Sequence, residues 1–167
     1  MNQDIRVLLE TWTPGCVWRA EVKLRTLPLA AINAELVALA QDENPNVRAG
    51  GLQLAGEVAP EVADDLAVAL ITDPVGFVRW AACERVLLRR CYRAADRLAQ
   101  LLIREENELV RNMAAGALGS VGDRKHLPAL QMALAVETGV DHEGSPIRNR
   151  IILAIETIET RCPLTAE

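Results

Sequence analysis

Apolar and polar positions follow the period of an α-helix in two separate stretches of the chain. From Val47, positions 0, 4, 7 and 11 are occupied by the residues Val47, Gly51, Leu54 and Val58. The stretch that begins at Val110 repeats this spacing with Val, Ala, Ala and Val. Residues spaced in this way lie on one side of a helix. The pattern therefore predicts a helix with one buried side in each stretch.

Related stretches occur four times along the chain. They read "VRAGGLQLAGEV", "VRWAACERVLLR", "VRNMAAGALGSV" and "IRNRIILAIETI", and they start at positions 47, 78, 110 and 147. The starts are 31, 32 and 37 residues apart. A period of this size indicates stacked units, each of which buries its apolar face only against its neighbours.

A further apolar helix is predicted in each unit, from "AINAELVALAQ", "EVADDLAVALI", "AADRLAQLLIR" and "HLPALQMALAV". Pro45, Pro74 and Pro146 stand shortly before three of the four related stretches, where proline favours a helix start. We interpret "GSVGD" at 119–123 as a glycine-terminated helix end, because the Lys-Ser/Thr of a phosphate loop is missing. Each unit is thus predicted to be a pair of antiparallel helices.

These units predict one repeat domain over residues 1–167. Residues 1–29, around "TPG", are expected to form capping helices that cover the apolar edge of the first repeat. Residues 30–161 hold the repeats, and residues 162–167 form a frayed tail.

Composition agrees with an all-α fold and narrows the function classes. Half of the residues are hydrophobic, and only five are aromatic. The net charge of −5 does not favour general binding to nucleic acid or anionic lipid. The chain has no long apolar run, so a cytoplasmic protein without a membrane span is expected. The four cysteines lack paired spacing and only two histidines are present, so no metal or other cofactor is expected.

The segment "VRNMAAGALGSVGDRKHLPALQMAL" from Val110 resembles the HEAT-like repeats of the phycobilisome (PBS) lyase type. The resemblance covers about residues 30–160. It implies a right-handed α-solenoid, a superhelix of about four to five antiparallel helix pairs. It also implies that the second helix of each pair lines the concave side of the superhelix.

The resemblance further implies a ladder of ion pairs along the stack. In such repeats the Arg after the Val typically pairs with an acidic residue. By position the expected pairs are Arg48 with Asp42, Arg79 with Asp73, and Arg111 with Glu105, while Arg148 has His142 and Asp141 at the matching place. We expect these arginines to stabilise the stack rather than to bind a partner.

Residues that differ between units are better candidates for function than the shared ones. The position two residues after the Val holds Ala49, Trp80, Asn112 and Asn149, and the position six residues after it holds Gln53, Glu84, Gly116 and Leu153. Neither position belongs to the inward set, so Trp80 is predicted to face solvent beside Glu84. An exposed Trp among polar residues is typical of an interaction hot spot. The alternative is a Trp covered by a neighbouring helix or loop. The predicted partner-binding residues on this face are Trp80, Glu84, Asn112, Asn149 and Gln53.

Arginines are concentrated between residues 79 and 97, where six of them stand against two acidic residues. Arg85 and Arg89 occupy places where the sibling units have apolar residues. Together with Arg93 they follow a four-residue step and are predicted to form one stripe, suited to carboxylates or phosphates. The alternative is a solvated helix end.

The longer interval before Ile147 places the insertion "ETGVDHEGSP" at 137–146, in a loop whose role stays open. It contains a single His-Glu pair, which does not favour metal catalysis. No arrangement of nucleophile, base and orienting group is present in the sequence.

The leading hypothesis is a non-enzymatic protein-interaction module that binds another protein on its concave surface, as an adaptor, an assembly factor or an inhibitory protein. One alternative, implied only by the resemblance, is a bilin lyase-type protein or a chaperone of chromophore attachment. Another is nucleic-acid binding through the Arg-rich helix. Neither nucleic acid nor a small-molecule ligand is the favoured partner.

Overall fold

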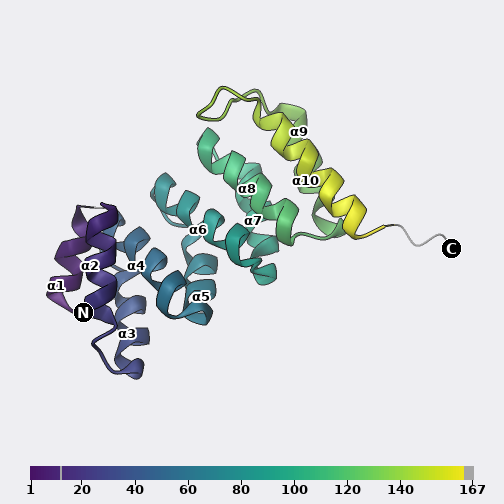
Figure 1. Ribbon diagram of the computed structural model, residues 1–167. Helices are drawn as coiled ribbons and strands as arrows, with labels where there is room; N and C mark the ends of the chain where they lie inside the picture. The colour runs from purple at the N-terminus through teal and green to yellow at the C-terminus, as the bar shows by residue number, and fades with distance from the viewer. Residues whose placement is uncertain (12, 164–167) are drawn as a thin grey trace. The chain divides into compact units, whose positions relative to one another are not determined.

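The computed structural model describes residues 1–11 and 13–163, and this part of the chain is built from helices. The helices are α1 (Gln3–Glu10), α2 (Pro14–Leu24), α3 (Leu29–Leu39), α4 (Pro45–Val58), α5 (Pro60–Leu70), α6 (Gly76–Arg89), α7 (Ala95–Arg104), α8 (Glu108–Val121), α9 (Leu127–Val136) and α10 (Ile147–Arg161) (Figure 1). Two 3₁₀ turns, Tyr92–Ala94 and Arg124–His126, precede α7 and α9. The predicted all-α class is confirmed.

The chain divides into two compact units, Met1–Arg85 and Val86–Glu167, and the boundary falls inside α6. The prediction of a single repeat domain, with capping helices and a tail, stays a prediction. Most of the expected tail, residues 164–167, lies outside the described residues.

In the first unit, α4 is the central helix and packs against α1, α2, α3 and α5. The predicted inward residues of α4 follow the expected pattern, since Val47, Gly51 and Leu54 are buried and Val58 is half-buried. Leu9 of α1 and Leu36 of α3 complete the apolar core of this unit.

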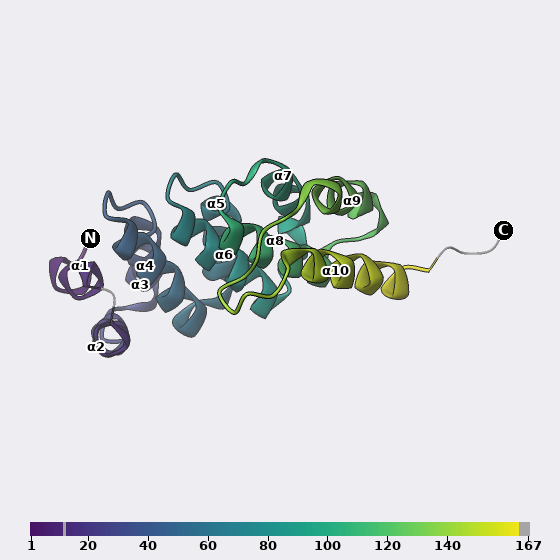
Figure 2. The ribbon, with the colours of Figure 1, turned by 90° about the horizontal axis from the view of Figure 1, so that it is seen from above.

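In the second unit, α8 packs between α7 and α10, and α9 contacts both α7 and α10. Helices α8 and α10 lie side by side in both ribbon views (Figures 1 and 2). All four predicted inward residues of α8 are buried, namely Val110, Ala114, Ala117 and Val121. The same spacing in α10, for which no inward residues were predicted, also falls on buried residues: Ile147, Ile151, Ala154 and Ile158.

Helix ends follow the chemistry read from the sequence. Pro45 is the first residue of α4, and the Asn44 side chain accepts a hydrogen bond from the backbone N–H of Asn46. Helix α8 ends at Val121, followed by Gly122. The interpretation of "GSVGD" as a helix end is therefore confirmed.

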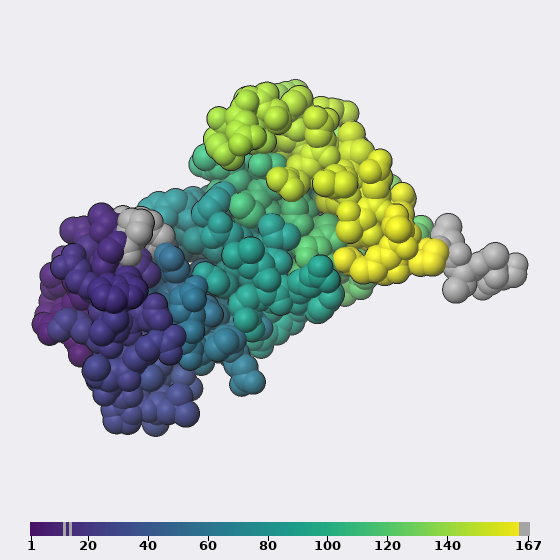
Figure 3. Space-filling view, in the orientation of Figure 1, coloured from purple at the N-terminus to yellow at the C-terminus, as the bar shows by residue number. Residues whose placement is uncertain are grey.

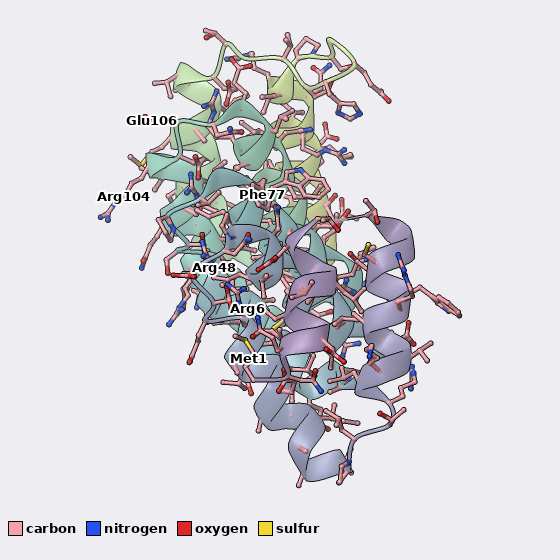
Figure 4. The ribbon with its side chains drawn as sticks, turned by 90° about the vertical axis from the view of Figure 1, so that its left-hand side faces the viewer. Met1, Arg6, Arg48, Phe77, Arg104 and Glu106 are labelled. Carbon is pink, nitrogen blue, oxygen red and sulfur yellow. The ribbon has the colours of Figure 1, made fainter. Side chains whose placement is uncertain are left out.

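The predicted arginine ladder exists, but its pairing is shifted by one repeat. Arg48 donates to the Asp73 carboxylate, from Nε at 2.7 Å and from Nη2 at 2.8 Å. The Asp42 carboxylate, expected for Arg48, accepts instead from Arg6 of α1. Figure 4 labels the two arginines. Arg48 reaches only the backbone carbonyl oxygen of Asp42, at 2.9 Å.

The same correction applies to Arg79 and Arg111. Arg79 donates to the backbone oxygen of Asp73, whereas the carboxylate of Asp73 is bound by Arg48. Arg111 donates to the Glu137 carboxylate at 2.6 and 2.9 Å and to the backbone oxygen of Glu105. We call the three ion pairs Arg6–Asp42, Arg48–Asp73 and Arg111–Glu137 the arginine ladder.

The shift has a local cause in the turn that precedes the second helix of each pair. One oxygen of Asp42, Asp73 and Glu137 accepts a hydrogen bond from the backbone N–H two residues later. This bond fixes the carboxylate in its own turn. The remaining hydrogen bonds to the carboxylate then come from an arginine of the preceding repeat or, for Asp42, from Arg6 of α1.

The insertion at 137–146 is a loop closed by an isolated bridge between Val140 and Pro146. Its first residue, Glu137, is the buried partner of Arg111. Arg148 donates to the backbone oxygens of Leu134 and Glu137, not to the expected His142 or Asp141. Within the described ranges, no helix has the length and apolarity to cross a membrane.

Candidate functional site

A groove on the second unit, between α8 and α10, is the candidate site. Its volume is about 240 Å³. We call it the arginine groove, and it is lined by Arg90, Gly116, Gly119, Ser120, Arg150, Leu153, Ala154, Thr157 and Arg161. Helix α10, which forms one side of the groove, is the yellow segment in Figure 3.

Close contact between two helices forms the floor of the arginine groove. A Cβ atom at Gly119 would lie 2.8 Å from the Cα and Cβ atoms of Ala154, closer than real side chains approach. Only glycine therefore fits at position 119 without moving α10. The side chain of Arg150 crosses from α10 toward α8 and lies over Gly116.

Arg161 is bound at one end of the groove. Its Nη1 donates to the backbone oxygen of Ser120 at 2.6 Å, and its Nη2 donates to the backbone oxygen of Gly122. These oxygens belong to the last turn of α8, where a cation is favourable because the helix dipole is negative. Arg161 thus joins the two helices and adds a fixed positive charge.

Arg90 and Arg150 are different, because neither makes a hydrogen bond or an ion pair with any residue that the structure describes. Both side chains are exposed. Asp141 in the loop has a lowered pKa. The hydrogen bond from the backbone N–H of Ser145 is the largest cause, and the charge of Arg150 makes the last of the contributions. The arginine groove therefore carries two unpaired guanidinium groups.

Arg90 also has an unusual backbone conformation. Its φ of 54° lies in the left-handed region, and it is the one non-glycine residue with positive φ among the described residues. The backbone N–H of Cys91 donates to the oxygen of Val86, so Arg90 occupies the helix-ending position that usually holds glycine. An L-residue there costs about 1 kcal/mol relative to glycine.

Comparison with known families agrees with this architecture. Residues 78–142 match a family model described as HEAT repeats. This part of the chain is therefore similar to HEAT repeats. Proteins with such repeats generally serve as protein-interaction scaffolds. Among curated proteins, none matches this chain. The finer resemblance to the PBS lyase type stays a prediction.

A second hollow lies between α7 and α9, on the first helices of two HEAT-like repeats, with a volume of about 470 Å³. Its wall includes the Arg111–Glu137 pair of the arginine ladder. Ile103, Met132 and Val136 expose apolar surface there. The charges in this hollow are paired, unlike those of the arginine groove.

None of the residues that the sequence analysis selected for partner binding lines the arginine groove. Gly116 and Leu153, both six residues after the first residue of their stretch, line it but were not selected. The predicted neighbours Asn112 and Asn149 do not line it; Asn112 is half-buried and Asn149 is exposed. Gln53 and Glu84, on helices α4 and α6, are half-buried.

Trp80 does not face open water as the spacing suggested. Its side chain is half-buried on α6. The residue at the corresponding position of α4, Ala49, is buried, so this position is not uniformly solvent-facing across the HEAT-like repeats. A role of Trp80 in partner binding stays a prediction.

The predicted stripe of Arg85, Arg89 and Arg93 does not run along one helix, because α6 ends at Arg89 and the left-handed Arg90 turns the chain. A role of these arginines in partner binding stays a prediction. Arg93 lies on a separate 3₁₀ turn and is exposed. Arg85 is half-buried, and its guanidinium lies against Gly56 so closely that a Cβ there would overlap it.

Arg90, Arg150 and Arg161 were not selected from the sequence. Arg90 was counted within the Arg-rich segment, but the signal that distinguishes it is its place just after a helix, where glycine is usual. Arg150 and Arg161 are 11 residues apart on α10, which is three helical turns and places both on one side.

Proposed function

We propose that the chain is a non-enzymatic protein-interaction module and that a partner protein docks in the arginine groove. The observation that carries this proposal is the pair of exposed, unpaired arginines, Arg90 and Arg150, beside Leu153. Arginine next to apolar surface is typical of the residues that dominate binding energy at interfaces. The HEAT repeats matched over residues 78–142 support the same class of function.

The groove is preformed, which favours binding of a macromolecule. It lies on two helices that pack directly through Gly119 and Ala154, and Arg161 links them. Residues on packed helices lose little freedom when a partner arrives, so the ordering cost of association is small.

The partner-binding residues predicted on α4 and α6 remain part of this proposal. Trp80 is half-buried on α6, and Glu84 lies one turn further along the same helix. Tryptophan is one of the residue types enriched at interaction hot spots. We treat this surface as a second contact of the same module.

A photo-cross-linking experiment tests the proposal. Leu153 in the groove is replaced by the photoreactive residue p-benzoylphenylalanine, and Val136 of α9 is replaced in the same way as a control. Val136 is 78% exposed and belongs to the same unit, but it lies outside the groove. Cross-linking is carried out in cells that produce the protein, and adducts are identified by mass spectrometry.

We expect one protein to be captured from position 153 and not from position 136. The same capture should disappear when Arg150→Glu is added. Equal capture from both positions, or none from position 153, contradicts the proposal.

A further inference from the structure

The unusual backbone of Arg90 and the charge of the groove together indicate the chemistry of the partner. Arg90 ends α6 in the left-handed region, where glycine would be favoured, yet its long side chain lines the arginine groove. Strained backbone positions of this kind cluster at functional sites. Arg90 therefore contributes to something other than the stability of its turn.

No carboxylate among the described residues forms an ion pair with the cations of the groove. Arg161 is held by backbone oxygens, which leaves its full charge in place. Within the same part of the chain, Arg90 and Arg150 have neither hydrogen bonds nor ion pairs, and Asp141 acts on Arg150 only through its charge. The rest of the wall is small, apolar or hydroxylic, with Leu153 and Ser120 as examples. An anion would find three guanidinium groups within one groove.

We propose that the arginine groove binds carboxylates of an acidic segment of the partner protein, with Arg90 and Arg150 as its two free anchors. This inference rests on the proposed function. Guanidinium groups bind carboxylates through paired, charge-assisted hydrogen bonds. Leu153 offers an apolar contact to a partner residue that lies between two acidic residues.

Size and charge favour an acidic peptide over the other anions. The groove has a volume of about 240 Å³, which suits one or two side chains and falls below the roughly 300–1,000 Å³ of small-molecule pockets. Nucleic acid requires a basic surface that follows many phosphates, whereas the groove offers only Arg90, Arg150 and Arg161.

The variant Arg90→Gly separates binding from folding. It removes the guanidinium and places the preferred residue at a left-handed position. We therefore expect the midpoint of thermal unfolding to stay the same or to rise by about 2–4 °C. Binding of an acidic peptide should weaken by at least tenfold, as expected when one charge-assisted contact is lost.

The probe is a fluorescein-labelled peptide with the sequence Glu-Leu-Glu-Glu-Leu-Glu, followed by fluorescence anisotropy with the full chain. A matched peptide with Gln at every Glu position controls for apolar binding, and a labelled single-stranded oligonucleotide controls for phosphate binding. Arg150→Ala should weaken peptide binding as Arg90→Gly does. Arg104→Ala serves as the control variant, because Arg104 is exposed on α7 and does not line the groove.

Three results overturn the inference: no binding of the Glu peptide to the wild type, equal binding of the Gln peptide, or unchanged affinity in Arg90→Gly. Preference for the oligonucleotide over the peptide also overturns it and assigns the groove to nucleic acid. If the Glu peptide does not bind while position 153 still cross-links a partner, the inference of an acidic segment is wrong and the proposed function stands. If position 153 captures no protein, the proposed function and this inference are both wrong.

Discussion

Arg48 and Asp73 form a buried ion pair that connects α4 to the turn before α6. Two donors of the guanidinium reach the two carboxylate oxygens at 2.7 and 2.8 Å, and both residues are less than a tenth exposed. The same Asp73 carboxylate accepts from the backbone N–H of Val75. One side chain thus holds its own turn and binds the preceding helical repeat.

Removal of this pair is predicted to destabilise the fold. Arg48→Ala should lower the free energy of unfolding by about 3 kcal/mol, because Asp73 then keeps a buried, uncompensated charge. Urea unfolding measures the change. The double variant Arg48→Ala/Asp73→Ala should lose less than the sum of the two single variants, since the residues act on each other.

An exposed pair provides the control for the Arg48 experiment. Arg25 bonds to Glu21 one turn earlier on α2, but the Arg25 side chain is 55% exposed. Arg25→Ala should therefore cost less than about 1 kcal/mol. Similar losses in Arg25→Ala and Arg48→Ala would show that the arginine ladder has no special weight in stability.

Acid should weaken the second unit through Glu137. The hydrogen bonds from Arg111 are the largest cause that holds the pKa of Glu137 below its ordinary value, and the backbone N–H of Gly139 adds to the effect. Because the pKa in the folded state is lowered, this stabilisation is present above the ordinary Glu value of about 4.3 and is lost as the pH falls through the folded value.

The free energy of unfolding, measured at a series of pH values from 7 down to 3, should therefore fall on acidification. Glu137→Gln should be less stable than the wild type at pH 7, and its stability should fall less steeply below about pH 4.3. Parallel curves for the two proteins would contradict this role of Glu137.

Leu54 tests the core of the first unit. It is fully buried on α4, so Leu54→Ala should cost about 2–5 kcal/mol through lost burial and a residual cavity. Leu29 carries the same side chain in the same unit but is 73% exposed. Leu29→Ala should change the free energy of unfolding by less than about 0.5 kcal/mol in the same denaturation experiment.

Cys16 is predicted to be the most reactive thiol. A hydrogen bond from the Thr11 hydroxyl is the largest cause that lowers its pKa, with a further contribution from Thr13 and a charge effect from Arg19. Cys83 and Cys91 are buried, whereas Cys16 is half-buried at the start of α2. Iodoacetamide near neutral pH, read by mass spectrometry, should modify Cys16 first.

Thr11→Val supplies the matched control for Cys16, because it keeps the side-chain shape and removes the hydroxyl donor. It should shift the pH midpoint of Cys16 alkylation upward. Faster modification of Cys162 than of Cys16 would contradict the prediction.

Trp80→Ala tests the second contact of the proposed module. We expect it to abolish capture of the partner identified from position 153 while the midpoint of thermal unfolding changes little. A marked loss of stability with unchanged capture would assign Trp80 to the core.

Much of the fold was contained in local sequence patterns. The 0, 4, 7, 11 spacing correctly predicted the buried side of α8, because a helix has a fixed period whatever its surroundings. Pro45 and Gly122 marked a helix start and a helix end for equally local reasons.

The partners of the arginines depended on tertiary structure. The sequence paired Arg48 with Asp42, but Asp42 is held by its own turn and receives Arg6 from a distant helix. Likewise, the left-handed turn at Arg90 breaks the predicted Arg stripe, and the packing of Gly119 on Ala154 brings Arg90, Arg150 and Arg161 to one groove. A helical period fixes which side of one helix is apolar, whereas the contacts of long charged side chains depend on how helices pack and where each turn redirects the chain.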